Sequence, residues 1–131
     1  MRIFLGNKVK PNPMITLSYG PDAAQTFDVY RASKPNGFVI FMVHGGGWRR
    51  GDNRADGVIT NKLAYWGAKG YTIVSTDYRV LPTTPDVQAA DVAAALAMAQ
   101  RNARDWKCDP DKFIVMGHSA GAHLVALINA E

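Results

Sequence analysis

Residues 113–125, FIVMGHSAGAHLV, hold a serine between two apolar segments. Gly117 and Gly121 flank Ser119 at a spacing of two residues on either side. Because glycine has no Cβ, a strand and a helix can approach each other there more closely than other side chains permit. The stretch therefore predicts a tight strand-to-helix turn with Ser119 at its apex, the G-x-S-x-G pattern of a serine nucleophile. These residue types are common, so the surrounding chain decides what the pattern means.

The rest of the chain alternates between strand and helix patterns. Unbroken apolar runs predict buried parallel strands, whereas alternating runs predict a half-exposed antiparallel pair at one edge of the sheet. Helices are expected between the parallel strands and after Ser119. The order predicts an α/β fold, with a mostly parallel sheet and flanking helices. The parallel strands are expected at 38–43, 71–76 and 113–116, the antiparallel pair at 15–19 and 27–31, and the helices at about 57–68, from Thr84 and from Ala120.

The helix that begins near residue 84 has clear start signals. Thr84 offers a capping hydroxyl, Pro85 fits the first turn, and Asp86 places a carboxylate near the positive end of the helix. Gly70 is expected to cap the end of the preceding helix. Along the helix, apolar residues recur at spacings of three and four and predict a buried face; they are Val92, Leu96, Ala99, Ala103 and Trp106.

Composition narrows the class of protein. The 131 residues predict one globular domain, an irregular arm at 1–14 followed by a folded unit at 15–131. The net charge is only +4, and the basic residues are scattered along the chain, which disfavours a nucleic-acid surface. No apolar run reaches the length of a membrane span, so we expect a cytoplasmic protein, although a removed signal peptide would leave no trace. Three histidines and one cysteine show no metal-ligand spacing, and we expect neither metal nor cofactor.

A second motif follows the first buried strand directly. His44-Gly-Gly-Gly-Trp48 contains three consecutive glycines whose backbone N–H groups are unshielded. A flexible loop is one interpretation, but neither spacing of phosphate-binding glycines fits. The other interpretation is an oxyanion hole, in which N–H donors stabilise the negative charge of acyl transfer.

Together, H44-G-G-G-W48 and G117-H-S-A-G121 resemble the α/β-hydrolase carboxylesterases and lipases of the hormone-sensitive-lipase-like group, and the related esterase and kynurenine-formamidase-like branch. D77-Y-R79, P85 with D91, and D109-P-D-K112 also match that pattern. The resemblance covers about residues 15–130. It implies an α/β-hydrolase fold.

The resemblance also implies roles for single residues. Ser119 would be the nucleophile of a serine carboxylesterase, and the N–H groups of Gly46, Gly47 and Ala120 would form the oxyanion hole. Trp48 and His118 would line the substrate pocket, with burial in the core an equal alternative for Trp48. His44 would hold the glycine loop, and Asp77 and Arg79 would form a structural pair near the site. The substrate would be a small ester or, alternatively, an aryl formamide or other amide.

A serine nucleophile also needs a histidine and a carboxylate, which this fold supplies later in the chain. After Ser119 only His123 and Glu131 follow, in the reverse order. We therefore expect the chain to be the N-terminal half of a longer hydrolase and inactive alone. Its partner would be the C-terminal half, a second fragment or a second copy. The alternative of another class is a non-catalytic relative that binds a partner.

Overall fold

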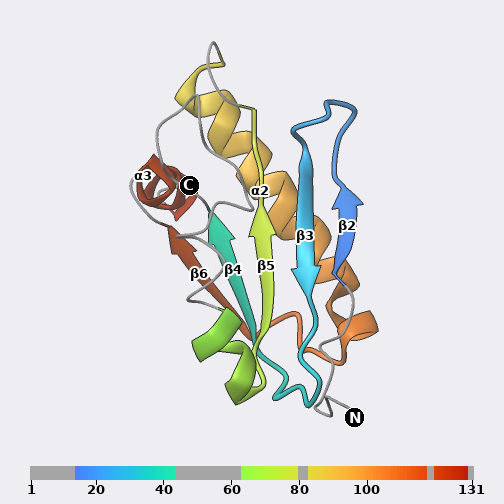
Figure 1. Cartoon of the computed structure of the whole chain (residues 1–131). Coiled ribbons are helices and arrows are strands. Elements are labelled where there is room, and N and C mark those ends of the chain that lie inside the picture. Colours follow the sequence, from blue (N-terminus) through green and yellow to red (C-terminus); the bar gives the residue numbers. More distant parts are fainter. Residues whose placement is uncertain (1–13, 44–62, 80–82, 118–119, 130–131) are drawn as a thin grey trace.

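A computed structural model describes residues 14–43, 63–79, 83–117 and 120–129 of the chain. Three strands come first, and helices and strands alternate after them, in the order that the sequence predicts (Figure 1). The elements are β2 (Ile15–Ser18), β3 (Thr26–Tyr30), β4 (Val39–Val43), the 3₁₀ helix η1 (Gly67–Lys69), β5 (Thr72–Thr76), α2 (Pro85–Asn102), the 3₁₀ helix η2 (Ala103–Trp106), β6 (Phe113–Gly117) and α3 (Ala120–Asn129).

The described strands form one five-stranded sheet in the order β2-β3-β5-β4-β6. β4 pairs in parallel with β5 on one side and with β6 on the other, while β3 joins β2 and β5 antiparallel. The predicted α/β fold is therefore confirmed, including the antiparallel pair at one edge. Chain segments far apart in sequence pair side by side, since β4 lies between β5 and β6.

β4 is buried along its whole length because both faces of the sheet are covered there. On one face, Phe41 and Val43 join a core with Val92 of α2 and Leu124 of α3. On the other face, Ile40 and Met42 form a second, smaller cluster, against which Leu63, Trp66 and Tyr71 pack. The unbroken apolar sequence of β4 follows from this double covering.

β6 is the outer strand of the described sheet and is much less enclosed than β4. None of its residues is fully buried, and Ile114 is 37% exposed although it is apolar. The sequence predicts an apolar strand here, and its pairing with β4 covers one edge only. The outer edge of β6 has no strand partner among the described residues.

The helix ends follow the sequence signals in part. Gly70 adopts a left-handed conformation with φ 94° and caps η1, as predicted. The part of the first expected helix at 57–62 lies outside the described residues, as does the arm at 1–13. Thr84 holds the N-cap position of α2, and Pro85 begins the helix. However, the Thr84 hydroxyl makes no capping hydrogen bond in the described structure, which corrects the sequence expectation.

Candidate active site

The two predicted motifs follow directly after β4 and β6, at the carboxyl ends of these two adjacent parallel strands. Val43, the last residue of β4, lies opposite Gly117, the last residue of β6, in the parallel register. The glycine segment therefore starts beside the segment that carries Ser119. Among the predicted site residues, Gly46, Gly47, Trp48, His118 and Ser119 lie outside the described residues.

Gly117 stands where the chain reverses from strand to helix, and its lack of a side chain is required there. A Cβ on Gly117 would lie 2.5 Å from the carbonyl oxygen of Gly121 and 2.7 Å from Cα of Ala122. These are main-chain atoms of α3, so they cannot turn aside as the end of a flexible side chain could. The close approach of β6 and α3 that the sequence predicts is confirmed on the described side of the turn.

Ala120 is the first residue of α3. The first N–H groups of a helix have no partner within the helix, and the helix dipole adds positive potential at that end. The first turn of α3 contains no acidic residue that would compete for these donors. The start of α3 can therefore accept negative charge that develops on a nearby oxygen.

An ion pair between a half-exposed guanidinium and a buried carboxylate lies beside the segment that follows β5. Nε and a terminal guanidinium nitrogen of Arg79 donate to the Asp91 carboxylate at 2.9 and 2.7 Å, and the Arg79 main-chain N–H donates at 3.0 Å. The Arg79 guanidinium is therefore bound to Asp91 of α2, a partner that the sequence analysis did not assign to it. The sequence placed Asp91 in the helix but gave no sign that it faces Arg79.

Gln25 completes this cluster from the turn between β2 and β3. Its amide donates to Asp91 at 3.1 Å, while its carbonyl accepts the N–H of Asp22 at 2.9 Å. Burial alone would raise the pKa of the Asp91 carboxyl. The hydrogen bonds from Arg79 and Gln25 outweigh that effect, so the pKa lies below its ordinary value. Asp91 is thus a fixed anion that joins three segments of the chain.

Two tyrosines border the same segment. The hydroxyl of Tyr19 donates to the carbonyl oxygen of Asp77 at 2.7 Å. Burial, followed by the carboxylates of Asp91 and Asp77, raises the pKa of Tyr19 far above its usual range. Burial and Asp77 also raise the pKa of Tyr78 to about 12. Both phenols therefore stay neutral near pH 7. The contact between Tyr19 and Asp77 joins residues 58 positions apart, and no sequence pattern predicted it.

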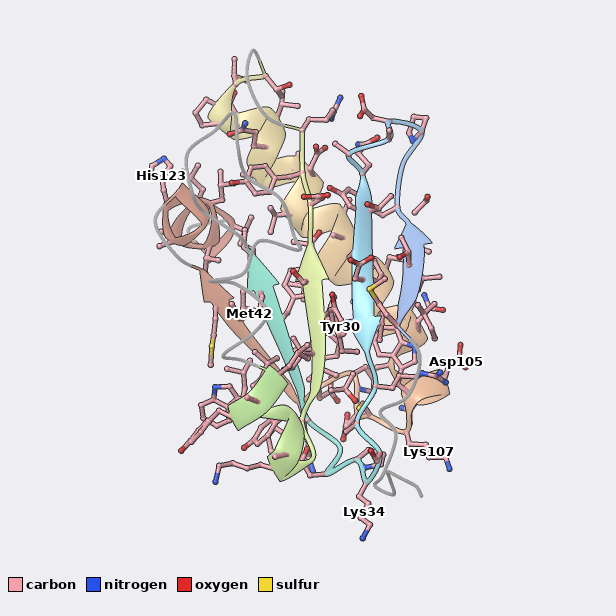
Figure 2. All side chains as sticks on the ribbon, in the orientation of Figure 1. Tyr30, Lys34, Met42, Asp105, Lys107 and His123 are labelled. Atoms are coloured by element: carbon pink, nitrogen blue, oxygen red, sulfur yellow. The ribbon has the colours of Figure 1, made fainter. Side chains whose placement is uncertain are left out.

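His123 is the only histidine within the described residues, and it is exposed on α3. Figure 2 shows its ring on the outside of α3, pointing away from the sheet. His44 and His118 lie outside the described residues, as does Glu131. The position of His123 on an outer helix surface is unsuited to a base that must approach a group at the end of β6.

Two further features concern ligands and membranes. Within the described segments, no group of three or more His, Cys, Asp or Glu side chains is arranged to hold a metal ion. Over the same residues, no helix combines the length and apolar character needed to cross a membrane.

Comparison with known proteins identifies the family. The BD-FAE family profile matches residues 27–131, which includes both motifs and all the parallel strands. The chain belongs to the BD-FAE family. Among relatives with assigned names, this BD-FAE chain is 38% identical over 115 residues to Esterase LipC of Mycobacterium tuberculosis, and the match covers 83% of the chain and 28% of LipC. It is 34% identical over 94 residues to arylacetamide deacetylase of Bos taurus, covering 68% of the chain and 23% of that enzyme.

Solved structures agree with this assignment. The BD-FAE chain matches Esterase B from Lactobacillus rhamnosis with a TM-score of 0.69 and 28% identity, over 93% of the chain and 41% of that structure. It matches an arylesterase with a TM-score of 0.68 and 25% identity, over 92% and 40%. The described sheet and helices are therefore part of an α/β-hydrolase fold. The chain spans about two fifths of these structures and a smaller share of the curated relatives.

Proposed function

We propose that this chain carries the nucleophile and the oxyanion hole of a serine carboxylesterase. The Ser119 hydroxyl attacks the ester carbonyl and forms an acyl-enzyme, which water then hydrolyses. The N–H groups of Gly46, Gly47 and Ala120 stabilise the oxyanion in each step. The observation that carries this proposal is the pairing of Val43 with Gly117. Because of this register, both motifs begin at the carboxyl ends of two adjacent strands.

The local structure supports a serine held at a tight turn. Gly117 tolerates no Cβ against α3, and α3 begins at Ala120, one residue after Ser119. Such a turn pushes the intervening side chain away from the sheet. The esterase names of LipC and of the matched structures support ester hydrolysis as the reaction class.

We propose that the histidine base and its carboxylate lie outside these 131 residues, in a longer protein. A serine hydrolase needs both groups, and the chain covers only 28% of LipC. His123 supports this indirectly, since its ring is exposed and points away from the sheet (Figure 2). The partner of this chain is then the C-terminal half of the same enzyme, a second fragment or a second copy.

The substrate is proposed at the level of chemical class. Short-chain acyl esters fit the esterase names of most relatives, and Trp48 and His118 are the proposed pocket residues. Amide substrates, including aryl formamides, are the second candidate, and the similarity to arylacetamide deacetylase favours keeping it. Hydrolysis rates for p-nitrophenyl acetate and p-nitroacetanilide separate these two reactions.

The experiment compares the complete gene product with its Ser119→Ala variant and with residues 1–131 alone. We expect the complete protein to hydrolyse p-nitrophenyl acetate, and Ser119→Ala to reduce kcat by about 10⁴-fold or more, because the acyl-enzyme cannot form. Residues 1–131 alone should show at most the residual activity of an oxyanion hole without a base.

Two results would contradict the proposal in different ways. Unchanged activity in Ser119→Ala would exclude Ser119 as the nucleophile. A monomer of residues 1–131 that turns over substrate, with loss of activity in Ser119→Ala, would place a base within these residues, and His118 and His123 would then be the candidates. Absence of activity in the complete protein would favour a non-catalytic, partner-binding relative.

A further inference from the structure

The amino ends of β4, β5 and β6 lie at the end of the sheet opposite to the proposed active site. Val39, the first residue of β4, pairs with Thr72 of β5 and with Phe113 of β6. The segments that precede these three strands therefore meet there. Figure 2 shows two of their lysines pointing away from the body of the molecule. Four lysines of these segments are exposed, although they lie far apart in sequence: Lys34, Lys69, Lys107 and Lys112.

Main-chain contacts fix the segment of Lys34 against the segment of Lys69. The N–H of Asn36 donates to the carbonyl oxygen of Gly70 at 2.9 Å, and its side-chain amide donates to the carbonyl oxygen of Lys69 at 3.3 Å. Gly70 has a left-handed φ of 94°, and a Cβ on it would lie 2.7 Å from the carbonyl oxygen of Lys34. Only glycine permits this approach without strain. The main chains that carry the two lysines are therefore held side by side.

A small pocket of about 350 Å³ lies between these two segments. The ammonium group of Lys69 lies 4.9 Å from the centre of the Tyr65 ring, and neither Lys34 nor Lys69 forms an ion pair within the described residues. Two positive charges thus share one pocket, and no acidic side chain of the described residues lines it. The lining residues are Ser33, Lys34, Gly67, Ala68, Lys69 and Gly70.

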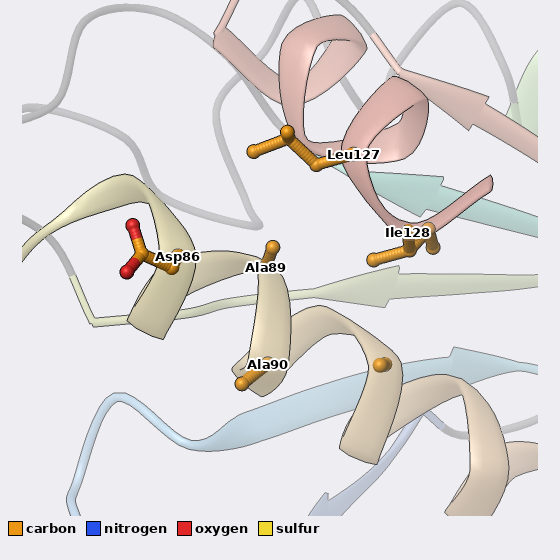
Figure 3. Close-up of a pocket in the computed structure, with 6 residues that line it drawn as sticks. Asp86, Ala89, Ala90, Leu127 and Ile128 are labelled. Atoms are coloured by element: carbon orange, nitrogen blue, oxygen red, sulfur yellow. The ribbon is translucent and has the colours of Figure 1, made fainter. Parts of the chain in front are cut away.

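Other pockets of the described structure have a different charge. A larger groove between α2 and α3 is lined by Asp86, Ala89, Ala90, Ala93, Leu127 and Ile128 (Figure 3). Its one charged residue among these is an acid, which repels anions. A further pocket, lined in part by Arg31 and Lys107, also contains Asp105. Of these three sites, the pocket beside Lys34 and Lys69 is the one whose described lining carries positive charge without a carboxylate.

The chemistry of this pocket fits a phosphate group. Two ammonium groups attract a divalent anion, and lysine is a common ligand of phosphate in proteins. The hydroxyl of Ser33 can donate a hydrogen bond to a phosphate oxygen. A Cβ on Gly67 would meet no atom within 4 Å, so the space at this residue is open to a ligand. The volume lies at the lower end of the range for small-molecule sites, which suits a small anionic group.

We propose that Lys34, Lys69 and Ser33 bind a phosphate group in this pocket. The site lies at the opposite end of the parallel strands from Val43 and Gly117, so the proposal goes beyond the proposed ester hydrolysis and does not rest on it. The phosphate belongs to a soluble ligand or to the headgroup of an anionic phospholipid, because the same three side chains meet the same oxygens in both.

The first measurement titrates the complete gene product with inorganic phosphate at constant ionic strength and follows the main-chain amides by two-dimensional NMR. We expect saturable shifts confined to residues 33–34 and 67–70. Lys34→Met and Lys69→Met should each weaken binding about fivefold, the contribution of one unit charge at contact distance in water. Lys34→Arg should retain the affinity because it keeps the charge. Gly67→Leu should abolish binding, because its side chain fills the pocket and leaves every charge in place.

The second measurement is co-sedimentation with vesicles of phosphatidylcholine, alone or mixed in equal parts with phosphatidic acid. Binding of free phosphate identifies a soluble ligand as the source. Binding of the mixed vesicles alone, lost in Gly67→Leu and weakened in Lys34→Met, identifies the lipid headgroup. Absence of both kinds of binding overturns the proposal.

Lys107→Met is the matched control, since Lys107 is exposed at the same end of the sheet but does not line this pocket. It should change neither measurement. If Lys107→Met weakens binding as much as Lys34→Met does, or if Gly67→Leu binds as the wild type does, the attraction is that of diffuse surface charge and the proposal is overturned. Neither readout uses ester hydrolysis, so a failure of the proposed function leaves this test unchanged.

Discussion

Different interactions stabilise the two halves of the sheet, the part around β2 and β3 and the part around β4 and β6. On the β2–β3 side, charged and polar side chains from three segments meet at Asp91, which binds Arg79 and Gln25. On the β4–β6 side, the described contacts are main-chain pairing, apolar packing and the close approach of Gly117 to α3. A side-chain network tolerates small adjustments, but a contact between main-chain atoms does not. The side that carries the proposed chemistry therefore depends on backbone geometry more than the other side does.

The largest effect is expected from Gly117→Ala. The new Cβ would lie 2.5 Å from the carbonyl oxygen of Gly121, so β6 and α3 must separate. We expect the free energy of unfolding to fall by about 3 kcal/mol, at the upper end of the range for overpacked sites. Chemical denaturation of the complete protein measures this loss.

Gly67→Ala is the control for the loss of glycine itself. A Cβ on Gly67 of η1 would meet no atom within 4 Å, and its backbone is not left-handed. The free energy of unfolding of this variant should equal that of the wild type or exceed it by up to about 1 kcal/mol, because alanine restricts the unfolded chain more than glycine does. Equal stability of Gly117→Ala and Gly67→Ala would show that the strand-to-helix turn relaxes easily, and the contrast between the two sides would fail.

A smaller effect is expected from Asp91→Asn on the opposite side. The change removes the charge and leaves one acceptor oxygen for the donors of Arg79 and Gln25. We expect a loss of about 2 kcal/mol at pH 7, below the 3–5 kcal/mol typical of broken buried pairs, because Arg79 is 37% exposed. Asp86→Asn, at an exposed position in the first turn of α2, should cost about 0.5 kcal/mol through the helix dipole.

The pH dependence of this loss tests its electrostatic origin. The folded protein lowers the pKa of Asp91, so the stabilisation is fully present above the unfolded-state pKa of about 3.9 and is lost as pH falls through the folded-state value. The difference in stability between wild type and Asp91→Asn should stay constant from pH 7 to about pH 5 and shrink below about pH 4. A difference that persists at pH 2 would mean that shape, and not charge, holds this junction.

The sequence predicted the sheet well because its strands are locally distinct. β4 and β6 are apolar runs, and the strands exceed their expected ranges only by Thr26 at the start of β3 and Gly117 at the end of β6. The roles of Ser119 and of the glycines after β4 stay predictions, since those residues lie outside the described structure. Their strands and the start of α3 are the parts that the structure bears on directly.

The side-chain partners could not be predicted in the same way. The sequence analysis grouped Arg79 with Asp77, two positions away, and did not identify Asp91 on α2, to which the guanidinium is bound. The choice of partner depends on the rotation of the helix about its axis, which a sequence pattern fixes only approximately. Asp91 is a buried polar residue, and hydrophobic periodicity carries no signal for the partner of such a residue.

The smallest effect is expected at the start of α2, where sequence and structure disagree about Thr84. Its backbone is extended, with ψ 158°, and its carbonyl oxygen accepts the N–H of Gln88 at 3.0 Å, as an N-cap residue should. The hydroxyl makes no capping bond in the described helix. Thr84→Ala should therefore lower the free energy of unfolding by less than about 0.5 kcal/mol, compared with about 1 kcal/mol for a capping side chain. Thr84→Ser, which keeps the hydroxyl without the methyl group, is the control. A loss of about 1 kcal/mol in Thr84→Ala that Thr84→Ser does not share would mean that the hydroxyl caps α2 in solution, and that the start of the helix beside the proposed site is fixed by a side chain after all.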